Sequence, residues 1–306
     1  MTGPAAGAGA IVALNDSFGL SDALVFETSP LGGPVARLTA GNSTATVAMQ
    51  GAQVLGWRQA GIERLWLSPA SRLATGRAVR GGIPVCWPWF GPHPLDPQKP
   101  AHGFVRTRTW TVVDSRRTDQ GVALSLATEC APGDQPLFSH EASARLTLTL
   151  DDALSLQLET RNTGQTQFAL TQALHTYFRV SDIDAARVEG LAGLTYIDKL
   201  ASDARITQDG AIRIDREVDR IYLGDTSALS LVDGPADQRR LQITSQGSSS
   251  TVVWNPWFEK TRRLGDMGGQ QAFRHMLCIE TANAGDDVVM LPPGGAHMLG
   301  ARYGRA

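Results

Sequence analysis

The sequence predicts an all-β fold, a large antiparallel β-sandwich with few short helices. Apolar and polar residues alternate in residues 145–150, which read RLTLTL, and again in residues 154–158. Alternation with period two places one face of a strand in a core and the other in solvent. The 32 glycines and 16 prolines end strands at short intervals, as many short strands require. No sustained helical period competes with this pattern.

The elements expected along the chain are short strands joined by turns. Residues 1–20 are expected to be a less ordered N-terminal extension. Residues 145–158 predict a hairpin that turns at Asp151 and Asp152. Further short strands are expected at residues 109–114, 122–128, 211–215 and 251–254. Because no linker, charge run or internal repeat interrupts the sequence, we expect one domain over residues 1–306.

Composition and charge exclude several classes of partner. The formal net charge is −2, so the overall field favours neither nucleic acid nor an anionic membrane. No apolar stretch approaches the roughly 20 residues of a membrane span. The three cysteines, Cys86, Cys130 and Cys278, are widely spaced and form no zinc motif. Since the N-terminus also lacks a signal peptide, we expect a cytoplasmic protein with reduced thiols and no metal or cofactor.

Residues 80–106, RGGIPVCWPWFGPHPLDPQKPAHGFVR, are the least strand-like segment. The prolines prevent a regular ladder, so a long rigid loop is expected, and such loops in compact domains are usually functional. Arg80 and Arg106 flank the loop without an acidic neighbour in sequence. Guanidinium groups match pairs of phosphate oxygens, which makes both arginines candidate anion ligands. The alternative is that they are ordinary surface residues.

Residues 168–180, FALTQALHTYFRV, predict a strand whose two faces differ. Leu174 and Phe178 belong to a core face, whereas His175 and Tyr177 lie among small residues on the opposite face. Because small neighbours leave room for a ligand, His175 is a candidate site residue. The alternative is a structural histidine whose hydrogen bonds are satisfied by the protein.

Residues 276–284, MLCIETANA, predict a strand that ends at Glu280, with this residue in phase with Met276 and Cys278. A carboxylate beside apolar groups loses solvation, which raises its pKa toward the range of a general base. Glu280 is therefore a second candidate. The alternative is a glutamate at a strand end, exposed to water.

Six segments together resemble one known family. They are RGGIPVCWPWFGP, AHGFVR, ALHTYF, REVDRIY, NPW and CIETAN, and the resemblance runs from about residue 38 to the C-terminus. In this order they are similar to the hexose-6-phosphate mutarotases (glucose-6-phosphate 1-epimerases) of the galactose mutarotase-like superfamily. The resemblance implies a two-layered antiparallel β-sandwich with the sugar site on its concave face.

The resemblance also implies roles for individual residues. His175 and Glu280 would be the catalytic pair. The implied substrate-binding residues are Arg80, Arg106, Asp219, His102 and Trp257. Family members often carry glutamine where this chain has Ala101, so one polar contact is either missing here or supplied by Lys99 or Gln98.

The implied reaction explains why an acid and a base are needed. Opening a pyranose hemiacetal removes a proton from the C1 hydroxyl and delivers one to the ring oxygen. Glu280 is expected to act as the base and His175 as the acid, with the roles reversed on closure. No metal, cofactor or covalent intermediate is required. The predicted partner is a hexose 6-phosphate, glucose 6-phosphate first, and the predicted state is a monomer.

Other functions are also compatible with the sequence. A non-catalytic carbohydrate-binding protein would stack a sugar on Trp87, Trp89 and Trp257. A mutarotase for unphosphorylated aldoses would have no use for the two arginines. A glycosidase would pair Asp219 with Glu280, and an inactive accessory protein would need neither acid nor base. Convergence of an acid and a base on one ligand in space separates an enzyme from a binding protein.

Overall fold

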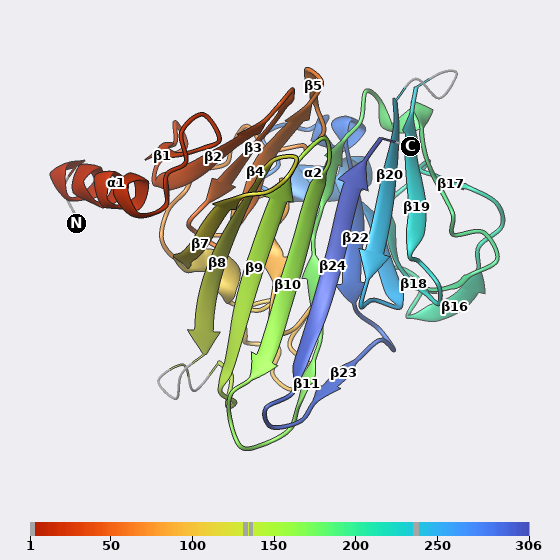
Figure 1. Cartoon of the computed structure of the whole chain (residues 1–306). Helices are drawn as coiled ribbons and strands as arrows, with labels where there is room; N and C mark the ends of the chain where they lie inside the picture. The colour runs from red at the N-terminus through yellow and green to blue at the C-terminus, as the bar shows by residue number, and fades with distance from the viewer. Residues whose placement is uncertain (1–3, 131–133, 135–136, 235–238, 306) are drawn as a thin grey trace.

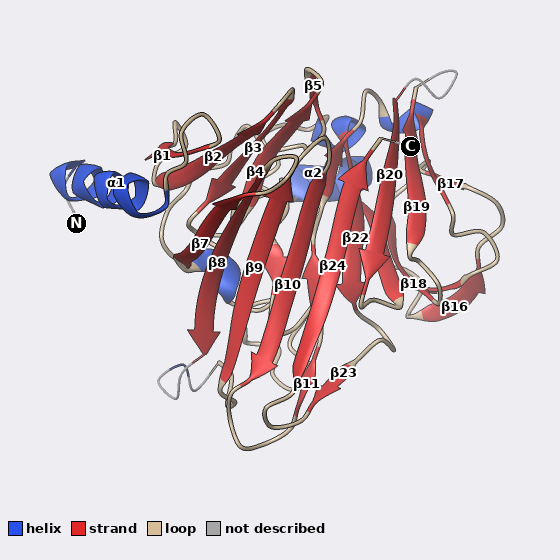
Figure 2. Ribbon diagram, in the orientation of Figure 1, coloured by secondary structure: helices blue, strands red, loops and turns tan. Residues whose placement is uncertain are grey.

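The computed structural model describes residues 4–130, 134, 137–234 and 239–305. Antiparallel strands dominate this part of the chain (Figures 1 and 2). Its two α-helices are α1 (Pro4–Phe18) and α2 (Trp257–Arg263). The all-β prediction is confirmed.

The first large layer is a nine-stranded sheet in the order β17-β14-β19-β20-β24-β10-β9-β8-β7. The predicted hairpin lies within it, because Leu150 pairs with Leu154 across the turn at Asp151 and Asp152. The predicted strands at 109–114, 122–128 and 211–215 are also present. The strands of this sheet are β7 (Thr111–Arg117), β8 (Val122–Cys130), β9 (Ala142–Leu150), β10 (Leu154–Asn162), β14 (Ala186–Glu189), β17 (Ile212–Arg213), β19 (Ala228–Asp233), β20 (Arg239–Gln246) and β24 (Ala296–Gly304).

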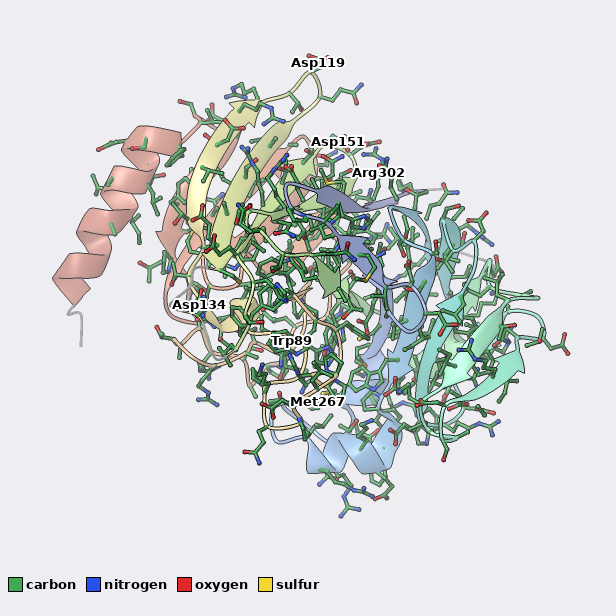
Figure 3. All side chains as sticks on the ribbon, turned by 90° about the horizontal axis from the view of Figure 1, so that it is seen from below. Trp89, Asp119, Asp134, Asp151, Met267 and Arg302 are labelled. Atoms are coloured by element: carbon green, nitrogen blue, oxygen red, sulfur yellow. The ribbon has the colours of Figure 1, made fainter. Side chains whose placement is uncertain are left out.

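The second large layer is an eight-stranded sheet in the order β16-β15-β18-β21-β22-β12-β6, with β13 paired to β22. It contains the strand predicted at 251–254. Figure 3 shows α2 and Met267 on the opposite side of the molecule from Asp151 and Arg302. The strands of this sheet are β6 (Val85–Cys86), β12 (Gln172–Leu174), β13 (Tyr177–Arg179), β15 (Thr195–Asp198), β16 (Ala204–Thr207), β18 (Val218–Leu223), β21 (Ser250–Asn255) and β22 (Met276–Asn283).

Two smaller sheets and three short 3₁₀ turns complete the described elements. The five-stranded sheet contains β1 (Leu24–Thr28), β2 (Pro34–Ala40), β3 (Ser43–Ala48), β4 (Val54–Gln59) and β5 (Ile62–Glu63). The two-stranded sheet pairs β11 (Phe168–Leu170) with β23 (Val289–Leu291). The turns are η1 (Val105–Thr107), η3 (Ile183–Ala185) and η5 (Ala272–His275).

One continuous apolar core joins the sheets. Leu148 and Leu156 of the nine-stranded sheet share it with Phe178 and Ile279 of the eight-stranded sheet. Because side chains alternate along a strand, the eight-stranded sheet has a second face. That outer face, turned away from the nine-stranded sheet, carries a smaller apolar cluster. Helix α2 and the loop of residues 80–106 lie beside this cluster.

The N-terminal segment differs from the expectation of a less ordered extension, because it forms helix α1. Ile11, Leu14 and Phe18 pack against the core, and the amide of Asn15 exchanges two hydrogen bonds of 2.8 Å with the backbone of Phe26. The apolar stripe is only two turns long, which explains why the sequence pattern did not reveal it. None of the helices in the described part of the chain has the length and apolar character to cross a membrane.

The three cysteines are free and buried, as predicted. Burial raises the pKa of the Cys130 thiol to about 12, and it raises the pKa of the Cys86 thiol as well. Both thiols therefore stay protonated at neutral pH and pack as small apolar side chains.

The segment 80–106 lies mostly outside the ladders, as its prolines predicted, and it is closed by a bridge between Trp87 and Gly103. Both tryptophans of the segment are buried. Trp87 donates its ring N–H to Thr160 Oγ1 at 2.9 Å, and Trp89 donates to the carbonyl of Pro100 at 3.0 Å. The loop is thus folded around its own aromatic residues.

We expect Gly103→Ala to destabilise the protein more than Gly91→Ala, its matched control in the same loop. Both glycines have positive φ, +69° and +70°, which costs a residue with a Cβ about 1–2 kcal/mol. A Cβ at Gly103 would lie 1.8 Å from the Trp87 carbonyl oxygen, whereas Gly91 has open space. The backbone would have to move at Gly103, which adds roughly 1–3 kcal/mol. Denaturant unfolding measures both changes, and equal losses would contradict the close approach.

Candidate active site

The register of four strands gathers side chains on the outer face of the eight-stranded sheet. Tyr177 in β13 pairs with Cys278 in β22. Cys278 pairs with Trp254 in β21, and Trp254 pairs with Asp219 in β18. Residues that face each other in neighbouring strands point to the same side, so these four form one row across the sheet. Glu280 lies two residues further along β22, in the next row.

His175 lies in a break between β12 and β13. The segment that we predicted as one strand is therefore three, β11, β12 and β13, and the N–H of His175 donates to the carbonyl of Pro84 at 3.0 Å. The predicted division into two faces is nevertheless confirmed. Leu174 and Phe178 lie in the main core, whereas Tyr177 belongs to the outer cluster and His175 lines a cavity beside it.

His175 and Glu280 approach each other closely and are both buried. Nδ1 of His175 lies 3.2 Å from Oε1 of Glu280, but the angles are not those of a hydrogen bond, so Nδ1 has no partner. Oε2 of Glu280 also has no partner. Buried polar atoms are normally hydrogen-bonded, and exceptions require an explanation such as a ligand or a catalytic role. The sequence placed Glu280 at a strand end; it lies instead in the interior of β22.

Burial shifts the two pKa values in opposite directions. It raises the pKa of Glu280 well above the usual value, and the nearby charge of Asp219 adds to this shift. It lowers the pKa of His175 well below the usual value, and electrostatic repulsion from His102, Arg80 and Arg106 acts in the same direction. Desolvation always disfavours the charged form. Burial therefore favours the neutral form of both side chains.

Arg80 and Arg106 lie near the two histidines, since both charges lower the pKa of His102, which burial reduces to about 3. Arg80 lines the cavity; its guanidinium donates to Asp266 at 3.0 Å and to the Tyr177 hydroxyl at 3.0 Å. Arg106 donates to the carbonyl of Ala101 at 2.9 Å, which occupies one of its five N–H donors. The sequence had not suggested the acidic partner of Arg80, because Asp266 is distant in the chain.

The end of the loop places His102 over the site. His102 has a left-handed φ of +64°, its N–H donates to the carbonyl of Gly91 at 2.7 Å, and its ring centroid is 5.6 Å from that of His175. Neither residue considered as a replacement for the missing glutamine lines the cavity. Lys99 instead donates to the carbonyl of Leu137 at 3.0 Å, and Gln98 is exposed.

These side chains enclose a cavity of about 220 Å³. Five of the residues predicted from the sequence line it: Arg80, His102, His175, Asp219 and Glu280. Trp254 and Lys260 also line it and were not predicted. Trp254 is in phase with Val252 on a strand that the sequence did predict, so alternation could have identified it. Lys260, 5.9 Å from the ring centroid of Trp254, comes from α2 and carried no local signal.

The structure does not bring Trp257 to this cavity. Its ring packs against Phe273, with centroids 5.0 Å apart, and its backbone N–H donates to Asn255 Oδ1 at 2.8 Å. Trp87 and Trp89 are buried. None of these three tryptophans is therefore available as the stacking platform that a carbohydrate-binding protein would need.

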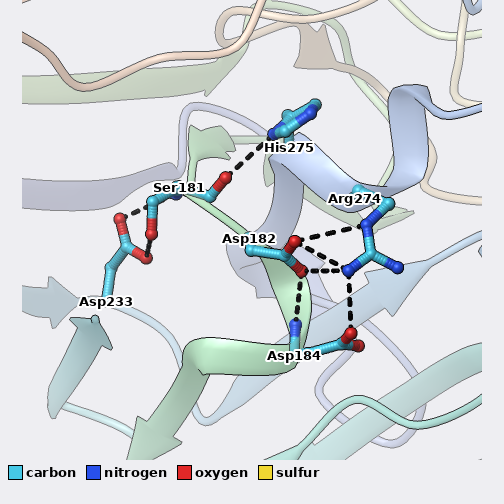
Figure 4. Close-up of polar contacts among 6 residues, drawn as sticks. All are labelled: Ser181, Asp182, Asp184, Asp233, Arg274 and His275. Atoms are coloured by element: carbon cyan, nitrogen blue, oxygen red, sulfur yellow. Dashed lines mark hydrogen bonds and ion pairs between the residues drawn. The ribbon is translucent and has the colours of Figure 1, made fainter. Parts of the chain in front are cut away.

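Two other polar regions lie away from this cavity. A larger hollow of about 490 Å³ lies beside Asn42 and Asp152, and no histidine or glutamate lines it. A second group, shown in Figure 4, ties the chain before β14 to η5: Arg274 binds Asp182 at 2.7 Å, and His275 Nδ1 lies 3.0 Å from the Ser181 carbonyl oxygen. Its bonds join loops, and none of its residues lines the cavity, so we regard it as structural.

Comparison with known proteins identifies the family. Residues 34–303 match the profile of the aldose 1-epimerase family. The chain belongs to this family. Among aldose 1-epimerase relatives, a protein of Cenchrus ciliaris provisionally named glucose-6-phosphate 1-epimerase is 36% identical over 264 residues, which cover 83% of this chain and 78% of that protein. A protein of Escherichia coli strain K12 with the same provisional name is 34% identical over 83% of this chain and 84% of that one.

Solved structures of aldose 1-epimerase type share the fold. A provisionally named mutarotase from Salmonella typhimurium superposes with a TM-score of 0.85 at 27% identity, over 93% of this chain and 94% of that one. A galactose mutarotase-like protein from Lactobacillus casei superposes with a TM-score of 0.70 at 15% identity, over 88% and 99% of the two chains. The resemblance drawn from the six sequence segments is confirmed.

The shifted pKa values predict how stability depends on pH. The pKa of Glu280 is raised in the folded state, so its protonated form favours folding and this contribution is lost as pH rises from about 4.5 through the raised value. The pKa of His175 is lowered, so its penalty on folding applies below about pH 6.5 and disappears above it. The contribution of Glu280 to stability should therefore fall as pH rises above about 4.5, until pH passes the raised pKa.

We expect Glu280→Gln to remove that decline. The stability of the variant relative to wild type should increase as pH rises from about 4.5 through the raised pKa of Glu280, because an amide carries no charge to bury. Thermal unfolding across this range measures the effect. Glu259→Gln, at an exposed position (64% of the side chain), controls for the loss of one negative charge. A difference that does not vary with pH would contradict the raised pKa.

Proposed function

We propose that the chain interconverts the α and β anomers of a hexose 6-phosphate, with glucose 6-phosphate as the first candidate. The observation that carries the proposal is the buried pair of His175 Nδ1 and Glu280 Oε2, both without a hydrogen-bond partner, in side chains that line one cavity with Arg80. Leaving such atoms unsatisfied costs about 1–3 kcal/mol each. A sugar that hydrogen-bonds to them offsets this cost on binding.

The pair performs ring opening by two proton transfers, one from the sugar to Glu280 and one from His175 to the sugar. The carboxylate of Glu280 accepts the proton of the C1 hydroxyl, the C1–O5 bond breaks to leave an aldehyde, and the protonated ring of His175 donates to O5. Rotation about C1–C2 presents the other face of the carbonyl. Closure reverses both transfers: His175 removes the proton from O5, and Glu280 returns one to O1.

The electrostatics of the site suit this cycle because the number of protons on the pair never changes. The active starting form has an ionised Glu280 and a protonated His175, and the open-chain form has the reverse. Burial raises the pKa of Glu280 and lowers that of His175, which lowers the free energy of the form with the proton on Glu280 relative to the form with the proton on His175.

Arginines supply the preference for a phosphorylated sugar. Arg80 lines the cavity, and Arg106 keeps donors beyond the one bound to Ala101, so we place the phosphate between them. Charge-assisted bonds from guanidinium to phosphate are about twice as strong as neutral ones. Asp219, 4.0 Å from Lys260 Nζ, is proposed to accept a hydrogen bond from a sugar hydroxyl. The provisional names of the relatives agree with this substrate class.

The proposal requires one copy of the chain, because the whole catalytic pair and both arginines come from it. We therefore propose a monomer as the active unit. A cytoplasmic location is proposed with it, since three free, buried thiols suit a reducing compartment. The carbohydrate-binding alternative is not favoured, because Trp87 and Trp89 are buried and Trp257 packs against Phe273 away from the cavity.

His175→Asn and Glu280→Gln should each lower kcat for anomer exchange by about 10²–10⁴-fold and leave the fold intact, because neither changes core volume. The double variant should be little worse than either single one, since each group needs the other for ring opening. Magnetisation-transfer NMR at pH 7 measures exchange above the spontaneous rate.

His275→Asn is the matched control, because His275 does not line the cavity and its Nδ1 instead lies 3.0 Å from the carbonyl oxygen of Ser181 (Figure 4). Near-normal exchange by Glu280→Gln would move the role of base elsewhere, first to Asp219. If the wild type itself showed only the spontaneous rate, the enzyme proposal would fail in favour of the binding protein.

Arg80→Ala and Arg106→Ala should raise KM for glucose 6-phosphate by roughly 10-fold or more, because each removes charge-assisted bonds worth about 1.5–3 kcal/mol. Exchange of unphosphorylated glucose should be much less affected, since that sugar has no phosphate to lose. Arg216→Ala, at an exposed position paired with Asp215, controls for the loss of one positive charge. Equal effects on both sugars would place the phosphate elsewhere.

A further inference from the structure

The catalytic pair has a third neighbour of a different chemical kind. Sγ of Cys278, a ring nitrogen of His175 and a carboxylate oxygen of Glu280 all lie within 4.8 Å of one another, and all three residues are buried. Among the residues that the structure describes, this is the one group in which three His, Cys, Asp or Glu donors come so close. The register explains it: Cys278 and Glu280 are two residues apart on the same face of β22, and His175 reaches them from the neighbouring chain segment.

We propose that His175, Cys278 and Glu280 form a binding site for a zinc-type divalent cation, and that this cation competes with the sugar phosphate for the catalytic pair. The cation acts as an inhibitor and not as a cofactor, because it occupies both the acid and the base. Competition rests on the proposed function, whereas binding of the cation does not.

The donor set selects the metal. Imidazole nitrogen, thiolate sulfur and carboxylate oxygen are the ligands of zinc sites, and a thiolate disfavours magnesium and calcium, which prefer oxygen. Two of the donor residues already offer atoms without partners, His175 Nδ1 and Glu280 Oε2. The proton transfers proposed for His175 and Glu280 do not need a sulfur atom, whereas Cys278 supplies the thiolate ligand that a zinc-type cation prefers.

The distances fit with small adjustments. In a tetrahedral site with metal–ligand bonds of about 2.0–2.3 Å, the ligand atoms lie roughly 3.3–3.8 Å apart. The 3.2 Å between His175 Nδ1 and Glu280 Oε1 is already close to this. The separations to Sγ of Cys278 are at most 4.8 Å. They reach the tetrahedral range when side-chain rotations move the ligand atoms by ~1 Å. Water in the adjoining cavity of about 220 Å³ supplies the fourth ligand.

Binding replaces protons and needs no redox partner. The cation takes the place of the Sγ–H proton of Cys278 and of any proton on the coordinating atoms of His175 and Glu280, and the displaced protons leave to solvent. The bonds formed are three metal–ligand bonds from the protein and one from water. The sugar can return only when the cation dissociates, because both occupy the same carboxylate and imidazole.

The experiment compares two buried cysteines of the same outer cluster. Cys86 and Cys278 both belong to this cluster, but only Cys278 is in the donor group. Wild type, Cys86→Ala and Cys278→Ala are titrated with Zn²⁺ against a chromophoric chelator, and with Co²⁺ followed in the near ultraviolet. We expect one Zn²⁺ per chain and a cobalt–thiolate charge-transfer band for wild type and Cys86→Ala. Cys278→Ala should lose the band and bind Zn²⁺ at least ~100-fold more weakly. Removing a residue that only hydrogen-bonds to a metal ligand already costs up to ~100-fold in affinity, and Cys278 is itself a ligand.

Inhibition is then measured as anomer exchange at free Zn²⁺ concentrations set by a metal buffer. The inhibition should be competitive with glucose 6-phosphate in wild type and largely relieved in Cys278→Ala. If the alanine variant fails to fold, Cys278→Ser is used instead, because serine keeps nearly the same volume. Equal Zn²⁺ affinity in the two cysteine variants, or no cobalt–thiolate band in wild type, would overturn the site. A cobalt band that depends on Cys278 in a chain without exchange activity would support the metal site and refute the proposed function.

Discussion

The register of β22 against β13 and β21 is the constraint on which the site depends. Alternate residues of β22 enter the main core, as Leu277 and Ile279 do, and the others face outward beside the cavity. A slip of one residue would exchange the two sets, burying Glu280 in the core and exposing core side chains. The large apolar core therefore holds the carboxyl of Glu280 in place, although that carboxyl itself opposes folding when ionised.

This arrangement links stability to catalysis. A buried carboxyl and a buried imidazole without complete hydrogen bonding are costly to the folded state, and the same burial raises the pKa of Glu280 toward the range of a general base. The cost is tolerated because more than a dozen strands share the core that surrounds them. The same burial collects a thiol beside the pair, which makes the site attractive to a soft cation as well as to a sugar.

The loop of residues 80–106 completes the cavity from the other side. It does so without regular pairing, because its tryptophans are buried and a close contact between Trp87 and Gly103 fixes its shape. Arg80 at one end of the loop and His102 near the other are thereby brought to one place. Rigid loops on a sheet are a common support for binding residues, and here proline and tryptophan supply the rigidity.

The sequence by itself determined the sheet class, the hairpin at Asp151 and Asp152, and the two faces of the segment around His175, because alternation and turn residues are local properties. The six sequence segments also indicated the family and five of the ten residues that line the cavity. Only the tertiary structure decided that Glu280 lies inside β22, that Trp257 packs away from the cavity, and that Lys260 and Trp254 join it. The meeting of Cys278 with His175 was likewise invisible in the sequence, because the two lie in segments that come together only through strand pairing. Contacts of this kind depend on register across the sheet, which no local pattern specifies.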